Sequence, residues 1–186
     1  LMVLMICGLA AMSATARDIV DLRGRTVAVP ETVRKISIDD SRYLVALSLI
    51  LRDPTTVLAA WPRDIHRLGQ KTYDQLAQKF PALASLRQVA SSAGNFDVES
   101  VLAAAPDVAV VSLGSGPTEG QIAQLKSAGI PVVFIDFFSN PFKNQAQSLR
   151  ILGMLTGAES KANEFIAFRE QRLSTIAQRV AKVAAN

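Results

Sequence analysis

The sequence predicts an α/β fold, namely a Rossmann-like lobe with a mostly parallel sheet flanked by helices, an N-terminal β-hairpin and a long C-terminal helix. Three observations predict this fold. Short apolar runs alternate with helical segments over most of the chain, which is typical of parallel sheets built from right-handed βαβ units. A glycine-centred turn joins two short apolar runs near the N-terminus. A helical apolar stripe ends the sequence.

The composition is that of a globular chain that can bury a full core. The 186 residues are 49% apolar and 19% charged, which suits one α/β domain or one lobe of a larger protein and excludes a disordered chain. The net charge of +4 is modest and its positive residues are scattered, so it favours an anionic ligand only weakly. A basic stripe is absent from the sequence, which argues against nucleic acid as a partner.

The elements after residue 16 follow a regular order. Residues 19–22 and 26–29 flank Arg23-Gly24-Arg25 and predict the hairpin. The sheet strands are expected at residues 35–39, 56–60, 87–90, 108–112 and 131–136, and the helices between them at residues 43–51, 73–79, 98–104 and 119–128. Two helices follow, at residues 144–155 and 159–185. The second has its apolar residues on one face and is longer than a small lobe needs.

Residues 1–16 have the pattern of a secretory signal peptide. An uncharged apolar run from Leu1 to Met12 is followed by Ala14-Thr15-Ala16, a small-residue motif that predicts cleavage after Ala16. The run is shorter than the roughly 20 apolar residues that span a bilayer. Because no basic residues precede it, we expect the signal to be partial. A buried core helix is the alternative, and the lack of a polar face disfavours it.

The only cysteine, Cys7, lies inside this segment. Ile6 precedes it where a lipoprotein signal needs a small residue, so lipid anchoring is not expected. After cleavage the chain has no cysteine, which excludes disulfides and thiolate metal sites. A cysteine-free exported domain with a large apolar core fits the bacterial periplasm.

Four segments carry a family pattern, in order along the chain. They are residues 21–36 with the Gly24-Arg25 turn, residues 96–110 with Pro106-Asp107, residues 121–133 with Gly129-Ile130-Pro131, and residues 152–157 followed by the long helix. Together they resemble the periplasmic substrate-binding proteins of iron-siderophore, haem and vitamin B12 ABC importers. The resemblance implies two α/β lobes joined by a rigid helix, with the ligand held between the lobes.

The resemblance also divides the chain and names its partners. We expect a partial signal peptide (1–16), an N-terminal ligand-binding lobe (17–157) and a long inter-lobe helix (158–186), truncated before a second lobe. It implies a non-catalytic receptor without a cofactor, whose partners are an iron-siderophore or related metal chelate and an ABC permease in the inner membrane. Acidic residues at the lobe tips dock the permease in this family, which makes Asp74 the docking candidate. The alternative is an ordinary solvated aspartate.

Ligands of parallel α/β sheets bind beyond the carboxyl ends of the strands. That rule selects five predicted loops, on which the candidate ligand-binding residues are Ser41, Arg42, Trp61, Arg63, Ser92, Gly114, Ser115, Phe137 and Phe138. Aromatic faces and arginine forks suit a bulky, partly apolar and often anionic ferric chelate. The alternative is that the aromatic residues belong to the edge of the core and the arginines are solvated.

No residue is predicted to be catalytic or to bind a metal ion. Residues 112–117 hold two glycines but lack the G-x-G-x-x-G pattern, and Pro117 removes an amide donor, so we predict a turn beside the cleft. His66, the only histidine, has no partner at a recognisable spacing. Aspartates that follow strands commonly cap the next helix, and this applies to Asp39, Asp40 and Asp136.

The sequence thus predicts a periplasmic solute receptor that captures a siderophore-like iron chelate and delivers it to an ABC import permease. Two alternatives stay open. One is an exported Rossmann-like enzyme that uses a nucleotide, with residues 114–120 as its phosphate loop. Export argues against it, because free nucleotides are scarce outside the cytoplasm. The other is an interaction module without a small-molecule ligand.

Overall fold

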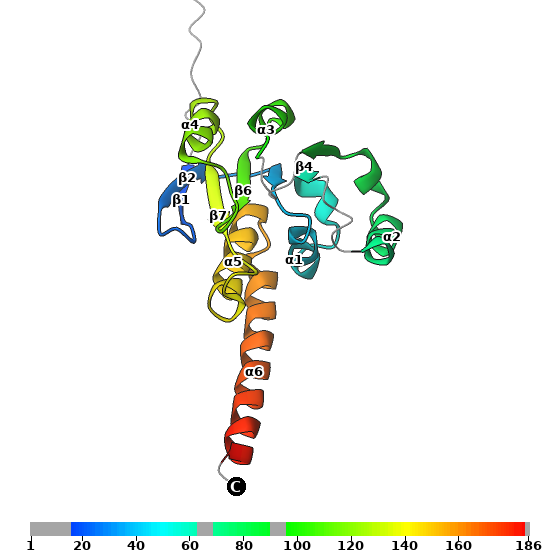
Figure 1. Cartoon of the computed structure of the whole chain (residues 1–186), viewed down its shortest axis with the longest axis vertical. Coiled ribbons are helices and arrows are strands. Elements are labelled where there is room, and N and C mark those ends of the chain that lie inside the picture. The colour runs from blue at the N-terminus through cyan, green and yellow to red at the C-terminus, as the bar shows by residue number, and fades with distance from the viewer. Residues whose placement is uncertain (1–15, 63–68, 90–95, 185–186) are drawn as a thin grey trace, which may run out of the picture.

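The computed structural model describes residues 16–62, 69–89 and 96–184 (Figure 1). Five parallel strands form one sheet in the order β5-β4-β3-β6-β7. They are β3 (Ile36–Ile38), β4 (Leu58–Pro62), β5 (Arg87–Val89), β6 (Val108–Ser112) and β7 (Val132–Ile135). A separate antiparallel hairpin consists of β1 (Ala16–Val20) and β2 (Thr26–Pro30). The predicted fold class is confirmed.

Helices cover both faces of the sheet. They are α1 (Tyr43–Ile50), α2 (Gln70–Lys79), α3 (Val98–Ala104), α4 (Glu119–Ser127), α5 (Pro141–Thr156) and α6 (Glu159–Ala184), with 3₁₀ turns η1 (Pro54–Val57) and η3 (Pro81–Ser85). Across the described ranges, none of these helices is both long and apolar enough to cross a membrane.

The strands alternate their side chains between two cores, as the period of two requires. In β6, Val108 and Val110 join the core under α1, α5, α6 and the hairpin. Ala109 and Val111 join the core under α3 and α4. All five residues of β6 are buried, which explains why a continuous apolar run in the sequence predicted a central parallel strand.

The main difference from the predicted elements lies at β4. The strand was expected at residues 56–60 but runs from Leu58 to Pro62. The Asp53 carboxylate accepts a hydrogen bond of 2.9 Å from Thr55 N–H and starts the 3₁₀ turn η1, which uses the first predicted strand positions. The strand is therefore shifted toward its carboxyl end. The hairpin also differs, because β1 begins at Ala16 and its loop is longer than predicted.

The hairpin loop covers the free edge of β7. Leu22 N–H donates to Phe134 C=O over 3.0 Å, and Phe134 N–H donates to the Asp21 carboxylate over 3.3 Å. The Arg25 guanidinium donates to Val132 C=O over 2.8 Å. An edge strand with unpaired backbone groups invites aggregation, and this loop blocks the edge of β7.

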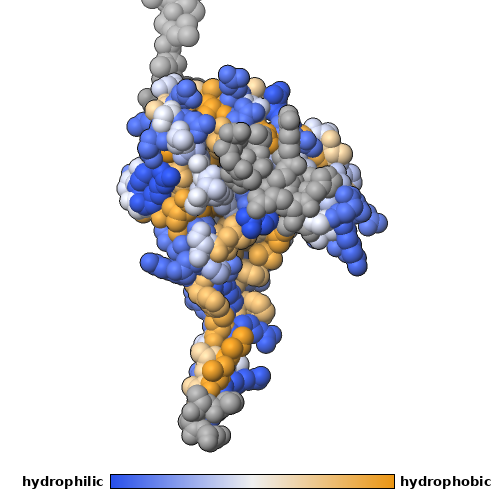
Figure 2. Space-filling model, viewed as in Figure 1, coloured by the Kyte–Doolittle hydropathy of each residue, from blue (hydrophilic) through white to orange (hydrophobic). Residues whose placement is uncertain are grey.

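The long helix α6 is anchored at its start and projects at its end (Figure 1). Ala162 and Ile166 are buried against α5, where a Cβ at Gly153 would lie 2.8 Å from the Cβ of Ala162. Beyond Arg169 the described side chains of α6 are exposed or half-buried. Figure 2 shows apolar surface along this projecting part, to which Ile176 and Val180 contribute.

Candidate functional site

The topology of the sheet places a crevice between β3 and β6. From β3 the chain proceeds to β4 and β5 on one side of the sheet, whereas β6 and β7 lie on the other side. Neighbouring strands whose connections run in opposite directions leave a gap at their carboxyl ends, where ligands of such sheets bind. The residues at those ends therefore define the candidate site.

A buried polar network joins β3, β6 and α1 at this point. The Asp39 carboxylate accepts hydrogen bonds of 2.9 Å from both the N–H and the hydroxyl of Ser112. The Tyr43 hydroxyl lies 2.8 Å from the Ser112 hydroxyl. Burial raises the pKa of Asp39 to about 7, although the bonds from Ser112 work in the opposite direction. Burial, with the nearby charge of Asp39, also raises the pKa of the Tyr43 phenol.

Next to Tyr43 in the sequence, the side chain of Arg42 is held in one position by Asp40 and Phe138. Its Nε and Nη2 donate to the Asp40 carboxylate over 2.9 and 2.6 Å. Its guanidinium carbon lies 3.4 Å from the centre of the Phe138 ring. Arg42 therefore makes a cation–π contact with Phe138, and the buried Asp40 carboxylate fixes the orientation of its planar guanidinium group.

Three aromatic rings form the wall next to Arg42. The ring centre of Tyr43 lies 5.7 Å from that of Phe137 and 5.9 Å from that of Phe138, and the second pair is stacked at 9°. Tyr43 is fully buried, Phe137 is half-buried and Phe138 is 41% exposed. The cluster thus passes from the core to the surface and presents one aromatic face outward.

Asp136 fixes the loop that carries the two phenylalanines. Its carboxylate accepts hydrogen bonds from the backbone N–H groups of Phe138, Ser139 and Asn140 and from the side chain of Asn144. Burial acts to raise its pKa, but these bonds outweigh it and lower the pKa to about 2. The carboxylate is therefore charged at neutral pH and holds the loop in place.

A pocket of about 420 Å³ opens beside this cluster, between α1, α5 and α6. Arg42, Phe137 and Phe138 line its rim. Its remaining walls are mostly apolar and consist of Val45, Ala46, Leu49, Gln145, Ala146, Leu149, Phe165, Ile166 and Arg169. An apolar pocket with a few oriented polar groups is what small-molecule sites share.

The structure brings together some of the predicted ligand-binding residues. Arg42, Phe137 and Phe138 line the same pocket. Gly114 and Ser115 are exposed on the adjacent loop after β6, and a Cβ at Gly114 would lie 3.5 Å from the Ser139 hydroxyl on the loop after β7. Whether any of these residues contacts a ligand stays a prediction. Arg63, Ser92 and His66 lie outside the described residues.

Two predicted positions need correction. Trp61 was placed in a loop, but it lies within β4 and is 1% exposed as part of the core. The shift of β4 turns this side chain into a core residue, which was the alternative interpretation. Ser41 is also fully buried, so its side chain is not on the rim.

Of the two glycines of residues 112–117, Gly116 has a packing role. A Cβ at Gly116 would lie 2.7 Å from Ser112 C=O and 2.8 Å from the Phe134 ring. Glycine is needed there because the loop passes directly over that ring. In the part of the chain that the structure describes, no group of three or more His, Cys, Asp or Glu side chains is placed to hold a metal ion.

Sequence reasoning missed two parts of the site. The Asp39–Ser112–Tyr43 network was not predicted, although an acid and a hydroxyl at the ends of adjacent strands were visible as a signal. The apolar walls from α1 and α6 were missed as well. Residues 43–51 are apolar apart from Ser48 and the Tyr43 hydroxyl, so a helix there exposes some apolar side chains, of which Val45 and Leu49 are 42% and 46% exposed.

Comparison with known proteins decides the family. The sequence profile of the periplasmic binding protein family matches residues 52–186. The chain belongs to the periplasmic binding protein family. No curated protein sequence matches significantly.

Solved periplasmic binding proteins share its fold. A periplasmic solute binding protein from Veillonella parvula superposes with a TM-score of 0.75 at 18% identity, over 88% of this chain and 48% of that one. The molybdate-bound MolA of Haemophilus influenzae has a TM-score of 0.68 at 20% identity, over 84% and 52%. The petrobactin-binding protein YclQ of Bacillus subtilis has a TM-score of 0.63 at 15% identity, over 91% and 55%. The chain spans about half the length of these structures.

Proposed function

We propose that this chain is the ligand-capturing lobe of a periplasmic receptor that takes up an iron chelate of the siderophore type and delivers it to an ABC import permease. The observation that carries the proposal is the pocket between α1, α5 and α6, whose rim follows the carboxyl ends of β3 and β7 and where Arg42 lies over Phe138 beside apolar walls. A chelate would bury its hydrocarbon and aromatic surface on the walls and offer its oxygens to the guanidinium.

The chemistry of the pocket favours a chelate over a small oxyanion. Solved structures with this fold include proteins that bind petrobactin and molybdate. A bare oxyanion needs several converging donors, whereas the lining here is mostly apolar and contains two cationic residues, Arg42 and Arg169. A chelate with an apolar exterior needs only one or two oriented donors.

We propose that α6 leads into a second lobe that closes the pocket. The pocket is open on one side, and the walls from α1 include half-exposed Val45 and Leu49. The solved relatives are about twice as long as this chain, which supports a two-lobed receptor in which residues 17–157 form one lobe and residues 158–186 form the connecting helix. The signal-like residues 1–16 support delivery to the periplasm.

We assign no catalytic role to the site. Asp39 and Tyr43 are the groups with raised pKa values, but both are buried and bonded to Ser112. A general acid or base must reach its substrate, and these two face the interior of the lobe.

Asp74 is the proposed contact with the permease. It is exposed on α2, and its carboxylate accepts a 2.7 Å hydrogen bond from the Gln70 side chain. Its second oxygen can receive an arginine of the permease. Replacing Asp74 with lysine should then weaken delivery to the permease and leave ligand affinity unchanged.

Calorimetric titration of the 17–186 chain with ferric siderophores, haemin and molybdate tests the function. We expect saturable binding of one ferric chelate and none of molybdate. Arg42→Gln should weaken binding by about ten-fold, because it removes a charge-assisted bond and a cation–π contact. Arg52→Gln is the matched control, since Arg52 is exposed just beyond α1.

Two results would contradict the proposal. One is the absence of chelate binding to a chain whose circular dichroism and cooperative unfolding show that it is folded. The other is chelate binding that Arg42→Gln leaves unchanged, since the pocket lined by Arg42 would then not be the chelate-binding site.

A further inference from the structure

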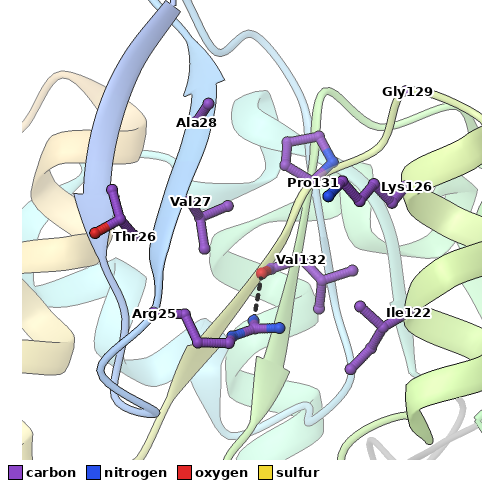
Figure 3. Close-up of a pocket in the computed structure, with 9 residues that line it drawn as sticks. All are labelled: Arg25, Thr26, Val27, Ala28, Ile122, Lys126, Gly129, Pro131 and Val132. Atoms are coloured by element: carbon purple, nitrogen blue, oxygen red, sulfur yellow. Dashed lines mark hydrogen bonds between the residues drawn. The ribbon is translucent and has the colours of Figure 1, made fainter.

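A second cleft lies at the opposite end of β7, away from the proposed ligand site. It has a volume of about 530 Å³ and separates β2 from the end of α4 and the start of β7 (Figure 3). Arg25, Thr26, Val27 and Ala28 line one side, and Ile122, Lys126, Gly129, Pro131 and Val132 line the other. The hairpin loop docks on β7 at Phe134 and Val132, and the cleft opens where the two elements diverge.

The strand that borders this cleft has an unpaired edge. Asp21 N–H donates to Arg25 C=O over 3.0 Å, so residues 21 and 25 form a hydrogen-bonded pair of the hairpin. Such pairs alternate along antiparallel strands, which leaves the backbone groups of Thr26 and Ala28 pointing away from β1. The two sheets do not pair with each other, and among the described residues no hydrogen bond reaches these groups. Figure 3 places β2 on the cleft side of the hairpin.

The residues that line the cleft determine which side chains of a bound partner would fit it. Val27, Ile122 and Val132 supply apolar surface between the strand edge and α4. Lys126 stands at the rim in the last turn of α4, and within the described residues its ammonium group has no ion pair. Arg25 is the other cation, and Asp21 already neutralises it. The lining contains no carboxylate.

We propose that this cleft binds an extended peptide segment that adds to β2 as a third strand and places an acidic side chain on Lys126. The backbone of the segment pairs with Thr26 and Ala28, as in other cases of strand addition to a free edge. An apolar side chain of the segment packs between Val27 and Val132, and the next acidic one reaches Lys126. This role is independent of the proposed chelate site.

Fluorescence anisotropy with the 17–186 chain tests the proposal. The probe is a labelled nine-residue peptide of alternating valine and threonine with one central glutamate, and a second peptide carries lysine in its place. We expect the acidic peptide to bind saturably and the lysine peptide to bind more weakly. Lys126→Glu should weaken the acidic peptide by about three- to five-fold, as for an exposed ion pair, and should improve binding of the lysine peptide.

Two further variants separate the backbone contribution from general effects. Thr26→Pro removes one outward N–H at the first position of an edge strand, where proline is tolerated, and should weaken both peptides by roughly five-fold. Lys71→Glu makes the same charge change on α2, away from the cleft, and should leave binding unchanged. Unfolding curves confirm that each variant is folded.

The proposal is overturned if neither peptide binds the folded chain. It is also overturned if Lys126→Glu and Lys71→Glu have equal effects, because binding would then follow only net charge. Unchanged affinity for both peptides in a folded Thr26→Pro variant would place the peptide elsewhere.

Discussion

At the scale of single residues, Asp21 shows what the motif Asp21-Leu22-Arg23-Gly24-Arg25 near the N-terminus does. One oxygen of its fully buried carboxylate accepts from the backbone N–H groups of Arg23 and Arg25, at 2.9 and 3.1 Å. The other accepts from the Arg25 guanidinium over 2.7 Å and from Phe134 N–H. Gly24 adopts a φ of 74°, which lets the loop close around the carboxylate. The motif therefore locks the hairpin onto the sheet.

Asp21→Asn should lower the free energy of unfolding by about 2 to 3 kcal/mol. The amide nitrogen would face the Arg25 guanidinium, so a donor would meet a donor in a buried position. Urea unfolding measures the loss. Asp18→Asn on β1 is the control, because Asp18 is exposed, and an equal loss in both variants would contradict this account.

Asp39 gives the chain an unusual dependence of stability on pH. Its folded pKa of about 7 lies above the unfolded value of about 3.9, so the folded state holds one more proton between these limits. The unfolding free energy should thus fall as pH rises from about 4 to about 7. Asp136, with a pKa of about 2, acts in the opposite direction and loses its contribution as pH falls below about 4.

Asp39→Asn should remove the pH dependence that Asp39 causes. The unfolding free energy of the variant minus that of the wild type should therefore be about 2 to 4 kcal/mol greater at pH 8 than at pH 4. Asparagine keeps the shape of the neutral acid and can both accept from and donate to Ser112. Urea midpoints measured between pH 4 and pH 8 test this. A wild-type slope of the opposite sign in this range would show that Asp39 stays ionised in the folded chain.

At the scale of elements, the sequence predicted most of the sheet and little of the site. Residues 98–104 and 108–112 have the predicted bounds, because a Pro-Asp turn and a run of buried side chains mark them clearly. The start of β4 was misplaced, since a 3₁₀ turn begun by the Asp53 side chain has no apolar signature. Trp61 changed its role with that shift. A shift of β4 by two residues does not change the fold class, but it decides whether the Trp61 side chain lies in the core or at the rim of the candidate site.

The contact between α5 and α6 rests on a glycine whose need was not visible in the sequence. Both Gly153 and Gly120 lie in helices, but only at Gly153 would a Cβ meet an obstacle, the Ala162 Cβ at 2.8 Å. Gly153→Ala should therefore separate α5 from α6 and destabilise the fold by about 1 to 3 kcal/mol. Gly120→Ala meets only the Thr118 hydroxyl at 4.0 Å and should be neutral or stabilising by up to about 1 kcal/mol. Thermal unfolding measures the stability of both variants. If α6 shifts freely to make room for the added methyl group, the two variants will be similarly stable, which would contradict this prediction.

At the scale of the whole molecule, one edge and both faces of the sheet are covered, whereas the distal part of α6 is not. The hairpin blocks the β7 edge, and helices cover both faces of the sheet. The projecting part of α6, in contrast, carries exposed Ile176 and Val180 beside Phe142, which is 76% exposed. These residues line a shallow groove of about 540 Å³. An apolar stripe of this kind marks a surface that another structure covers.

Without a second lobe, the 17–186 chain should self-associate through this stripe. Arg172 and Lys182 flank the apolar residues, so the contact area stays small and the association weak, with a dissociation constant on the order of 0.1 mM. Sedimentation velocity across a range of concentrations measures it. Ile176→Lys should keep the chain monomeric, because it places a charge in the middle of the stripe. Gln178→Lys adds the same charge at an exposed position outside the stripe and should associate like the wild type. If both variants behave alike, net charge and not the apolar surface controls the association, and the stripe needs no covering lobe.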